Sequence, residues 1–269
     1  MSSGKHFHNV LCLSEAKGMD IMMTKIFAHR GASGYAPENT LEAFALAMEM
    51  GADGIELAVQ RTKDGEVVVI HDEVIDRVSN GKGLVKDYTL VQLRKFSFDN
   101  HMEGYENISI PTLKEVLELV KASKMEVNIE LKTGIYWYLG LEEKVLEIVK
   151  NREMHKRVIY SSFNHYSVQK IKELDQKAET AYLYSDVILN VENYAKGTGV
   201  CGLHPAVYHL KMADFVERYK ESGCKIRVWT VNDAQDMRFF IQNELEAVIT
   251  NYPDEALKIR DDMQKKERK

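Results

Sequence analysis

The chain has 269 residues, of which 45% are hydrophobic and 29% charged, and its net charge is −5 with a pI near 6.0. This composition is typical of a globular protein and excludes a disordered, collagen-like or disulfide-framework chain. The small excess of acidic residues favours neither nucleic acid nor an anionic membrane as a partner. No run of about 18 apolar residues occurs, so we expect no transmembrane helix and no stable membrane association. The sequence carries no signal for an oligomeric state.

The cysteines and the chain ends bear on location. Cys12, Cys201 and Cys224 are odd in number and lack metal-binding spacing, which is typical of a reducing compartment. Residues 1–24 contain no apolar core long enough for a signal peptide. We therefore expect a cytoplasmic protein with a poorly ordered extension at 1–24, a folded domain at 25–257 and a frayed, charged tail at 258–269.

Short apolar segments with strand character alternate with amphipathic segments of helical period. The predicted strands are 25–29, 54–59, 66–71, 126–132, 158–162, 181–184, 200–203, 226–231 and 247–250. The predicted helices are 40–50, 113–121, 141–149, 167–174, 213–222 and 234–242. This alternation predicts a parallel sheet, either closed as a barrel or open and doubly wound. In both architectures a ligand binds beyond the carboxyl ends of the strands.

Two places interrupt the regular alternation. The six residues between Val59 and Glu66 include Lys63-Asp64-Gly65 and are too few for a parallel crossover, so we predict an antiparallel hairpin there. Residues 72–111 form a forty-residue excursion with several glycines. Insertions of this size in a compact fold are usually functional, and we expect a small cap over the site.

Ionisable residues lie near the carboxyl ends of four predicted strands. Because side chains alternate between the faces of a strand, these residues should project from one edge of the sheet. Burying such groups costs free energy unless they pair with one another or bind a charged ligand. One such residue alone is often a paired core group, but six together favour a functional site. They are His29, Arg30, Glu56, His71, Glu130 and Lys132.

This set of side chains suits the cleavage of a phosphate ester. Two carboxylates offer the oxygen ligands that Mg²⁺ or Ca²⁺ prefers. Arg30 and Lys132 complement a phosphate, one as a planar fork and one as a point charge. Two imidazoles can accept and donate protons near neutral pH. Together they predict metal-assisted phosphodiester hydrolysis.

The motifs strongly resemble those of the glycerophosphodiester phosphodiesterase family. The first motif is long and specific, and the whole series covers about residues 25–256 in the family's order. The motifs read His29-Arg30-Gly31-Ala32-Ser33-Gly34-Tyr35-Ala36-Pro37-Glu38-Asn39-Thr40, Gly54-Ile55-Glu56-Leu57, Ile70-His71-Asp72, Ile110-Pro111-Thr112-Leu113, Asn128-Ile129-Glu130-Leu131-Lys132, Ser161-Ser162-Phe163, Val228-Trp229-Thr230-Val231-Asn232 and Ile249-Thr250-Asn251-Tyr252-Pro253.

The resemblance implies a (β/α)8 TIM barrel with a small insertion after the third strand. It also implies hydrolysis of glycerophosphodiesters, such as glycerophosphocholine or glycerophosphoethanolamine, to sn-glycerol 3-phosphate and an alcohol, with one divalent cation, Mg²⁺ or Ca²⁺. The roles it implies are listed by position: His29 and His71 as general acid and base, Arg30 and Lys132 as phosphate contacts, Glu56 and Glu130 as metal ligands, and Trp229 as an aromatic that lines the substrate pocket. Trp229 also fits a packing role at the barrel rim.

One position departs from the family's pattern. The second strand of the family reads Glu-x-Asp, with two metal ligands, whereas this chain has Glu56-Leu57-Ala58. The methyl group removes a charge and one or two oxygens from a cation that wants six or more ligands. Ala58 is either a natural loss or a deliberate inactivating substitution, and the intact remainder of the site favours the second. We expect no replacement from Asp53, at the wrong end of its strand, or from Asp72, which should face away from His71.

Three functions remain open on these residues. The first is a metal-dependent phosphodiesterase, impaired here by Ala58. The second is a non-catalytic binding protein for glycerol phosphates on the same barrel. The third is a lysophospholipase D, for which an apolar groove at the insertion would be the distinguishing feature.

Overall fold

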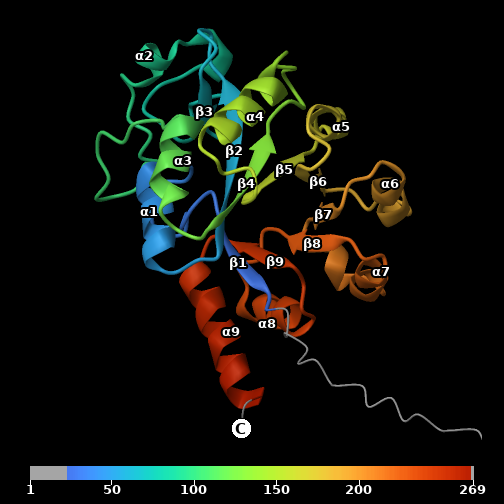
Figure 1. Cartoon of the computed structure of the whole chain (residues 1–269). Helices are drawn as coiled ribbons and strands as arrows, with labels where there is room; N and C mark the ends of the chain where they lie inside the picture. The colour runs from blue at the N-terminus through green and yellow to red at the C-terminus, as the bar shows by residue number, and fades with distance from the viewer. Residues whose placement is uncertain (1–22, 268–269) are drawn as a thin grey trace, which may run out of the picture.

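The computed structural model describes residues 23–267, so the predicted extension at 1–24 lies almost entirely outside the described residues. Eight parallel strands close into a barrel because β1 pairs with both β2 and β9 (Figure 1). The strands are β1 (Lys25–His29), β2 (Gly54–Arg61), β4 (Glu126–Leu131), β5 (Val158–Ser162), β6 (Glu179–Tyr184), β7 (Gly202–Pro205), β8 (Lys225–Val228) and β9 (Ala247–Thr250). The predicted (β/α)8 barrel is confirmed.

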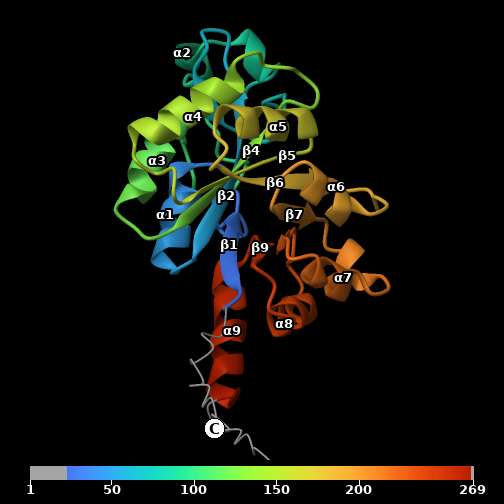
Figure 2. The same cartoon turned by 45° about the vertical axis from the view of Figure 1, so that its right-hand side comes forward.

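Helices surround the barrel (Figure 2). They are α1 (Leu41–Glu49), α2 (Leu90–Leu93), α3 (Leu113–Lys121), α4 (Leu141–Asn151), α5 (His165–Leu174), α6 (Val191–Gly197), α7 (Phe215–Glu221), α8 (Ala234–Gln242) and α9 (Pro253–Glu267), with 3₁₀ turns at Val85–Asp87 and His209–Lys211. Local sequence sets their starts: the hydroxyl of Thr112 accepts from the Glu115 amide while the Glu115 carboxylate returns to the Thr112 amide. Two large apolar clusters fill the space between helices and strands.

The barrel interior is apolar in the middle and charged at its amino end. Phe27, Ile159, Ala181, Ala247 and Ile249 form the central layer. Below them lies an ion-pair network around the buried Arg227: Arg227 with Glu179 and Glu246, Lys25 with Glu126 and Glu246, and Lys225 with Glu179. The charged side chains at this end therefore pair mainly with one another, although Arg227 Nε and Glu126 Oε2 are buried without a hydrogen-bond partner in the described part of the chain.

The segment after β2 forms the predicted antiparallel hairpin. β3 (Val67–Val69) pairs with β2 in the register Val59 to Val69, so this prediction is confirmed. The insertion at 72–111 follows and has a small core of its own, with Ile75, Val85, Leu93 and Phe98 buried. The core shows that the insertion is packed against the barrel, while its role as a cap stays a prediction.

The C-terminal segment differs from expectation. Residues 258–267, which we predicted to be frayed, form most of α9, one continuous helix (Figures 1 and 2). Pro253 opens this helix, where its missing N–H costs nothing. Arg260 is buried and pairs with Asp53 at the amino end of β2, and it also donates to the Thr24 carbonyl. These contacts hold α9 to the bottom of the barrel.

Among the described residues, the structure contains no helix that is long and apolar enough to cross a membrane.

Candidate active site

A pocket of about 330 Å³ opens at the carboxyl ends of the barrel strands. Six of the seven residues that the sequence indicated line it directly, and the seventh, Lys132, contacts two of them, Glu130 and His71. The structure therefore brings the whole predicted set together. The lining residues are His29, Arg30, Glu56, His71, Asn128, Glu130, Phe163, Leu183, Trp229 and Ile249.

His29 ends β1 and is held by Asn251, the residue that directly follows the last strand, β9. Its Nδ1 lies 2.7 Å from Oδ1 of Asn251, so this nitrogen donates and the other, Nε2, faces the pocket. Nε2 is 3.9 Å from Oε2 of Glu56. Burial, together with the positive charge of Arg30, lowers the pKa of His29 to about 3. The imidazole is therefore neutral at physiological pH, with a lone pair directed into the pocket.

His71 is held by a carboxylate, which the sequence analysis did not anticipate. Asp72, expected to face away from His71, instead accepts a hydrogen bond from its Nδ1 at 2.6 Å. The expectation was wrong because β3 ends at Val69, so strand alternation does not extend to residues 71 and 72. Burial and the charges of Arg30 and Lys132 lower the pKa of His71. Its Nε2 lies 3.4 Å from Nζ of Lys132.

Glu56 and Glu130 both line the pocket and are both buried. Burial and the neighbouring charge of Glu130 raise the pKa of Glu56 to about 8. A cation bound beside two buried carboxylates stabilises their charged forms. This charge arrangement fits a divalent cation.

The third carboxylate of the family's pattern has no counterpart in the structure. Ala58 lies on β2 directly opposite Glu130 in the strand register and is fully buried. Asp53, as expected, lies at the other end of β2, paired with Arg260. The described residues contain no group of three or more His, Cys, Asp or Glu arranged to hold a metal ion. A cation at Glu56 and Glu130 would therefore take its other ligands largely from water or substrate.

Two cations complete the site and are fixed by acids. The guanidinium of Arg30 donates to Glu38 at 2.8 Å, while its backbone amide donates to Glu56 at 3.1 Å. The ammonium of Lys132 lies 3.3 Å from Oε1 of Glu130. Both cations thus lie beside the carboxylates and imidazoles, where a phosphate would meet them.

Glu38 joins the loop after β1 (residues 30–40) to the insertion. Besides Arg30, it accepts two hydrogen bonds from Arg77, whose Nε donates to Asp72 at 2.6 Å. Burial alone would raise the pKa of Glu38, but the hydrogen bonds from Arg77 and the charge of Arg30 outweigh it and lower the pKa to about 2. A chain of ion pairs therefore runs from Arg30 through Glu38, Arg77 and Asp72 to His71.

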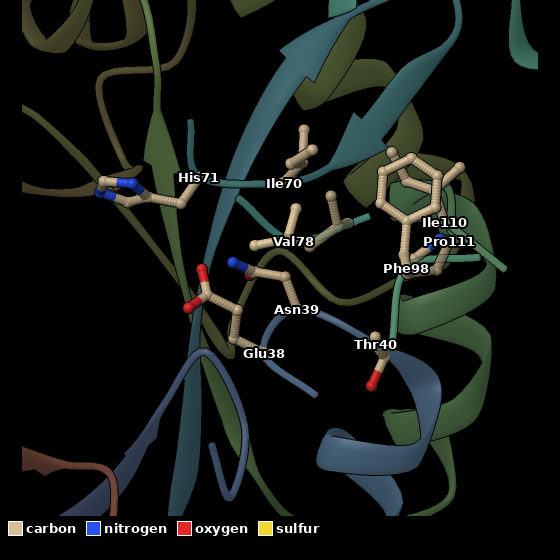
Figure 3. Close-up of a pocket in the computed structure, with 10 residues that line it drawn as sticks. Glu38, Asn39, Thr40, Ile70, His71, Val78, Phe98, Ile110 and Pro111 are labelled. Carbon is tan, nitrogen blue, oxygen red and sulfur yellow. The ribbon is translucent and has the colours of Figure 1, made fainter. Parts of the chain in front are cut away.

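A second cavity, of about 240 Å³, lies behind His71 between the loop after β1 and the insertion. Figure 3 shows that the His71 imidazole and the Glu38 carboxylate point away from Phe98 and Ile110 on its apolar side. The buried amide nitrogen of Asn39 has no hydrogen-bond partner there. The His71 imidazole, which lines both spaces, thus points away from the apolar side of this cavity.

Trp229 forms an aromatic wall of the main pocket. Its indole N–H donates to the His204 carbonyl at 2.7 Å, and its ring meets Phe163 edge-to-face with centroids 5.5 Å apart. Phe163 also lies under the Lys132 ammonium, 5.9 Å from the ring centroid. The indole therefore both packs at the rim and lines the pocket.

Sequence reasoning assigned no role to four residues that hold the site together: Glu38, Asp72, Arg77 and Asn251. Three of them lie within motifs quoted for the family resemblance, which was the available signal. Arg77 lies in the irregular insertion, where no strand or helix pattern reports the direction of a side chain.

Comparison with known proteins agrees with this geometry. A model of the glycerophosphoryl diester phosphodiesterase family matches residues 29–255. A glycerophosphodiester phosphodiesterase of Caldanaerobacter subterraneus is 41% identical over 239 residues, which cover 88% of this chain and 98% of the relative. One of Bacillus altitudinis is 43% identical over 246 residues, covering 90% of this chain and 100% of the relative.

Solved structures give the same result. An Oleispira antarctica phosphodiesterase in complex with the product sn-glycerol-3-phosphate has a TM-score of 0.80 at 28% identity, covering 89% of this chain and 97% of that chain. A glycerophosphodiester phosphodiesterase of Thermotoga maritima has a TM-score of 0.74 at 32% identity, covering 88% and 98% of the two chains.

Proposed function

Because this chain belongs to the glycerophosphoryl diester phosphodiesterase family, we propose that it hydrolyses glycerophosphodiesters, such as glycerophosphocholine or glycerophosphoethanolamine, to sn-glycerol 3-phosphate and an alcohol. The observation that carries the proposal is the single pocket that unites two neutral imidazoles, two carboxylates and two cations. The Oleispira antarctica relative, which holds sn-glycerol-3-phosphate, supports the product class. The free cysteines at 201 and 224 support a cytoplasmic location.

Arg30 and Lys132 would bind the phosphodiester anion. Arg30 is fixed by Glu38 and Lys132 by Glu130, so neither side chain has to be ordered when the substrate arrives. The same cations favour the extra negative charge that develops on the phosphate oxygens in the transition state. Trp229 would cover the apolar face of the glycerol carbons.

His71 is assigned as the general base. The Asp72 carboxylate holds Nδ1–H, directs the Nε2 lone pair into the pocket and stabilises the imidazolium that forms when His71 takes a proton. The proton would come from the attacking group, either water or the neighbouring hydroxyl of the glycerol.

His29 is assigned as the general acid. Its hydrogen-bond partner, Asn251, is neutral, so it stabilises a protonated ring less than Asp72 stabilises protonated His71. A bound phosphate anion offsets the charge of Arg30, which is one cause of the low pKa of His29. With the phosphate bound, His29 would take up a proton from solvent at Nε2 and then deliver it to the oxygen of the leaving alcohol.

Glu56 and Glu130 would hold one divalent cation, Mg²⁺ or Ca²⁺, and this ion would supply Lewis-acid stabilisation of the phosphate charge. With Ala58 in place of a third carboxylate, we expect weak cation binding and impaired turnover. The same deficit supports a second candidate function, in which the pocket captures glycerol phosphates without turnover.

The test is cleavage of glycerophosphocholine, followed by ³¹P NMR, with a matched substrate in which p-nitrophenol replaces choline. Appearance of glycerol phosphate supports the proposal. His29→Asn should lose activity on glycerophosphocholine but keep most of it on the p-nitrophenyl ester, whose leaving group needs no proton. His71→Asn should lose both. Tight glycerol phosphate binding without turnover, even after Ala58→Asp, would favour the binding protein.

A further inference from the structure

Two cysteines lie opposite one another on neighbouring strands, at the end of the barrel away from the pocket. In the parallel register of β7 and β8, Gly202 pairs with Lys225. Cys201 and Cys224 directly precede these two residues, and the Lys225 amide donates to the Cys201 carbonyl at 2.8 Å. The two strands therefore already lie side by side at the cysteines. We call Cys201 and Cys224 the dithiol pair.

Both side chains of the dithiol pair point to the outside of the barrel. Side chains alternate between the two faces of a strand. Lys225 reaches the ion-pair network inside the barrel, so Cys224 before it points outward. A side chain added at Gly202 would meet Ala181 of the central layer, so Gly202 faces the interior and Cys201 before it points outward. The two thiols therefore share one face of the sheet.

The spacing and exposure of the dithiol pair suit a disulfide. Paired residues on neighbouring strands lie about 5 Å apart, within the Cα separation of about 4.4 to 6.8 Å that a disulfide spans. Both cysteines are free, with Cys201 exposed and Cys224 half-buried. The Cys201 thiol donates to the Thr180 carbonyl on β6 at 3.7 Å, on the side away from β8. Rotation about the Cα–Cβ bond of the exposed Cys201 brings its sulfur towards Cys224.

We propose that the dithiol pair is a site of reversible oxidation by low-molecular-weight disulfides. The Cys201 thiolate attacks one sulfur of the small disulfide, whose other half leaves and takes up the proton that Cys201 lost. The Cys224 thiolate then attacks the Cys201 sulfur, and the second half leaves in the same way. The protein gives up two electrons and two protons, and the small disulfide is reduced to two thiols. This modification does not depend on the proposed hydrolysis.

The surroundings of the dithiol pair set the order of attack and the consequence. Cys201 reacts first because it is exposed, whereas Cys224 is half-buried. The resulting bond closes a loop over residues 201–224, which contains α7, and so joins β7 to β8 covalently. An exposed disulfide is readily reduced again, as a reversible modification in a reducing compartment requires.

Oxidation by glutathione disulfide tests the proposal. The full chain carries Cys12→Ser, so that only the dithiol pair can react. Mass spectrometry should find the tryptic peptides of Cys201 and Cys224 cross-linked, and dithiothreitol should release them. With about 0.1 mM glutathione disulfide, the cross-linked protein should exceed protein carrying two glutathiones by about tenfold or more, because a neighbouring thiol has an effective concentration in the millimolar range.

Two matched variants test the order of attack, and circular dichroism checks that both fold. Cys224→Ser should stop at one glutathione on Cys201, because the second thiol is missing. Cys201→Ser should react at Cys224 about tenfold more slowly, because that thiol is half-buried. Oxidation should also raise the unfolding temperature of the Cys12→Ser chain, since the closed loop restricts the unfolded state. Cys224→Ser should show no such rise.

Three results would overturn the inference. The first is a folded chain that gains two glutathiones without a cross-link, because the two thiols would then not meet. The second is a dimer linked through Cys201, seen on a non-reducing gel, because this thiol would then pair between copies of the chain. The third is a lower unfolding temperature after oxidation, because the bond would then distort the barrel instead of following the strand register.

Discussion

At the scale of single residues, the two imidazoles of the pocket differ in the group that accepts a hydrogen bond from Nδ1. His71 has a carboxylate on Nδ1 and His29 has an amide oxygen. A carboxylate stabilises the imidazolium that a base becomes, while a neutral amide only fixes the ring. The difference of partner is the basis for assigning the base to His71 and the acid to His29.

Replacing Asp72 by Asn should therefore damage catalysis more than binding. In the Ala58→Asp background we expect Asp72→Asn to lower kcat by about 10³-fold, because the imidazolium loses its counter-charge and the ring its fixed tautomer. The pKa of His71, already low, should fall further, so the rising limb of the pH profile of kcat/KM should move to lower pH. Asp262→Asn, a substitution at an exposed position of α9, is the control. A change confined to KM would contradict this role of Asp72.

At the scale of elements, the Glu38 carboxylate joins the insertion to the loop after β1. Glu38 accepts hydrogen bonds from Arg30, which lies on the loop after β1, and from Arg77, which lies in the insertion. Arg77 in turn fixes Asp72. Movement of the insertion would therefore shift Asp72 and, through it, the ring of His71. The packing of the insertion thus helps to hold the site in its working geometry.

Glu38→Gln should lower the free energy of unfolding by about 2 to 3 kcal/mol at pH 7. This value follows from the difference between the pKa of Glu38 in the folded protein, about 2, and its ordinary value of 4.5. Since the folded-state pKa is depressed, this stabilisation is present above about pH 4.5 and is lost as the pH falls toward 2. Urea unfolding of both proteins between pH 7 and pH 3 measures it, with Glu42→Gln on the exposed face of α1 as control. A difference that stays constant across this range would contradict the ion-pair account.

At the scale of the whole molecule, the periodicity of the apolar residues predicts the barrel, and the ionisable residues near the strand ends predict the site. Each of the nine predicted strands has its counterpart, because short buried segments between helices leave few alternatives. Periodicity missed α6, a seven-residue helix with only two buried apolar side chains, Val191 and Ala195. Periodicity also predicted a frayed C-terminal tail, whereas the structure has a helix there that is held by the pairing of Arg260 with Asp53. That contact joins residues 207 positions apart, which no local pattern reports.

The same limit applies to the site. His29, Glu56 and Glu130 lie on strands, so alternation places them correctly in the barrel mouth. Asp72 and Arg77 lie beyond the end of β3, in irregular backbone, where tertiary packing alone decides which way a side chain points. The positions of the residues that we assign to binding and reaction could be predicted, whereas those of the residues that orient them could not.

The most direct test of the account is metal-dependent cleavage of glycerophosphocholine by the chain with Ala58, with Ala58→Asp and with the uncharged near-isostere Ala58→Asn, each in Mg²⁺, Ca²⁺ or chelator. Circular dichroism checks that all three fold. Because Ala58 faces Glu130 on the interior of the barrel, Ala58→Asp should raise turnover by about 10²-fold or more, and chelator should abolish the gain. Ala58→Asn should gain little. Equal rates from all three proteins, unaffected by chelator, would contradict a cation held between Glu56 and Glu130.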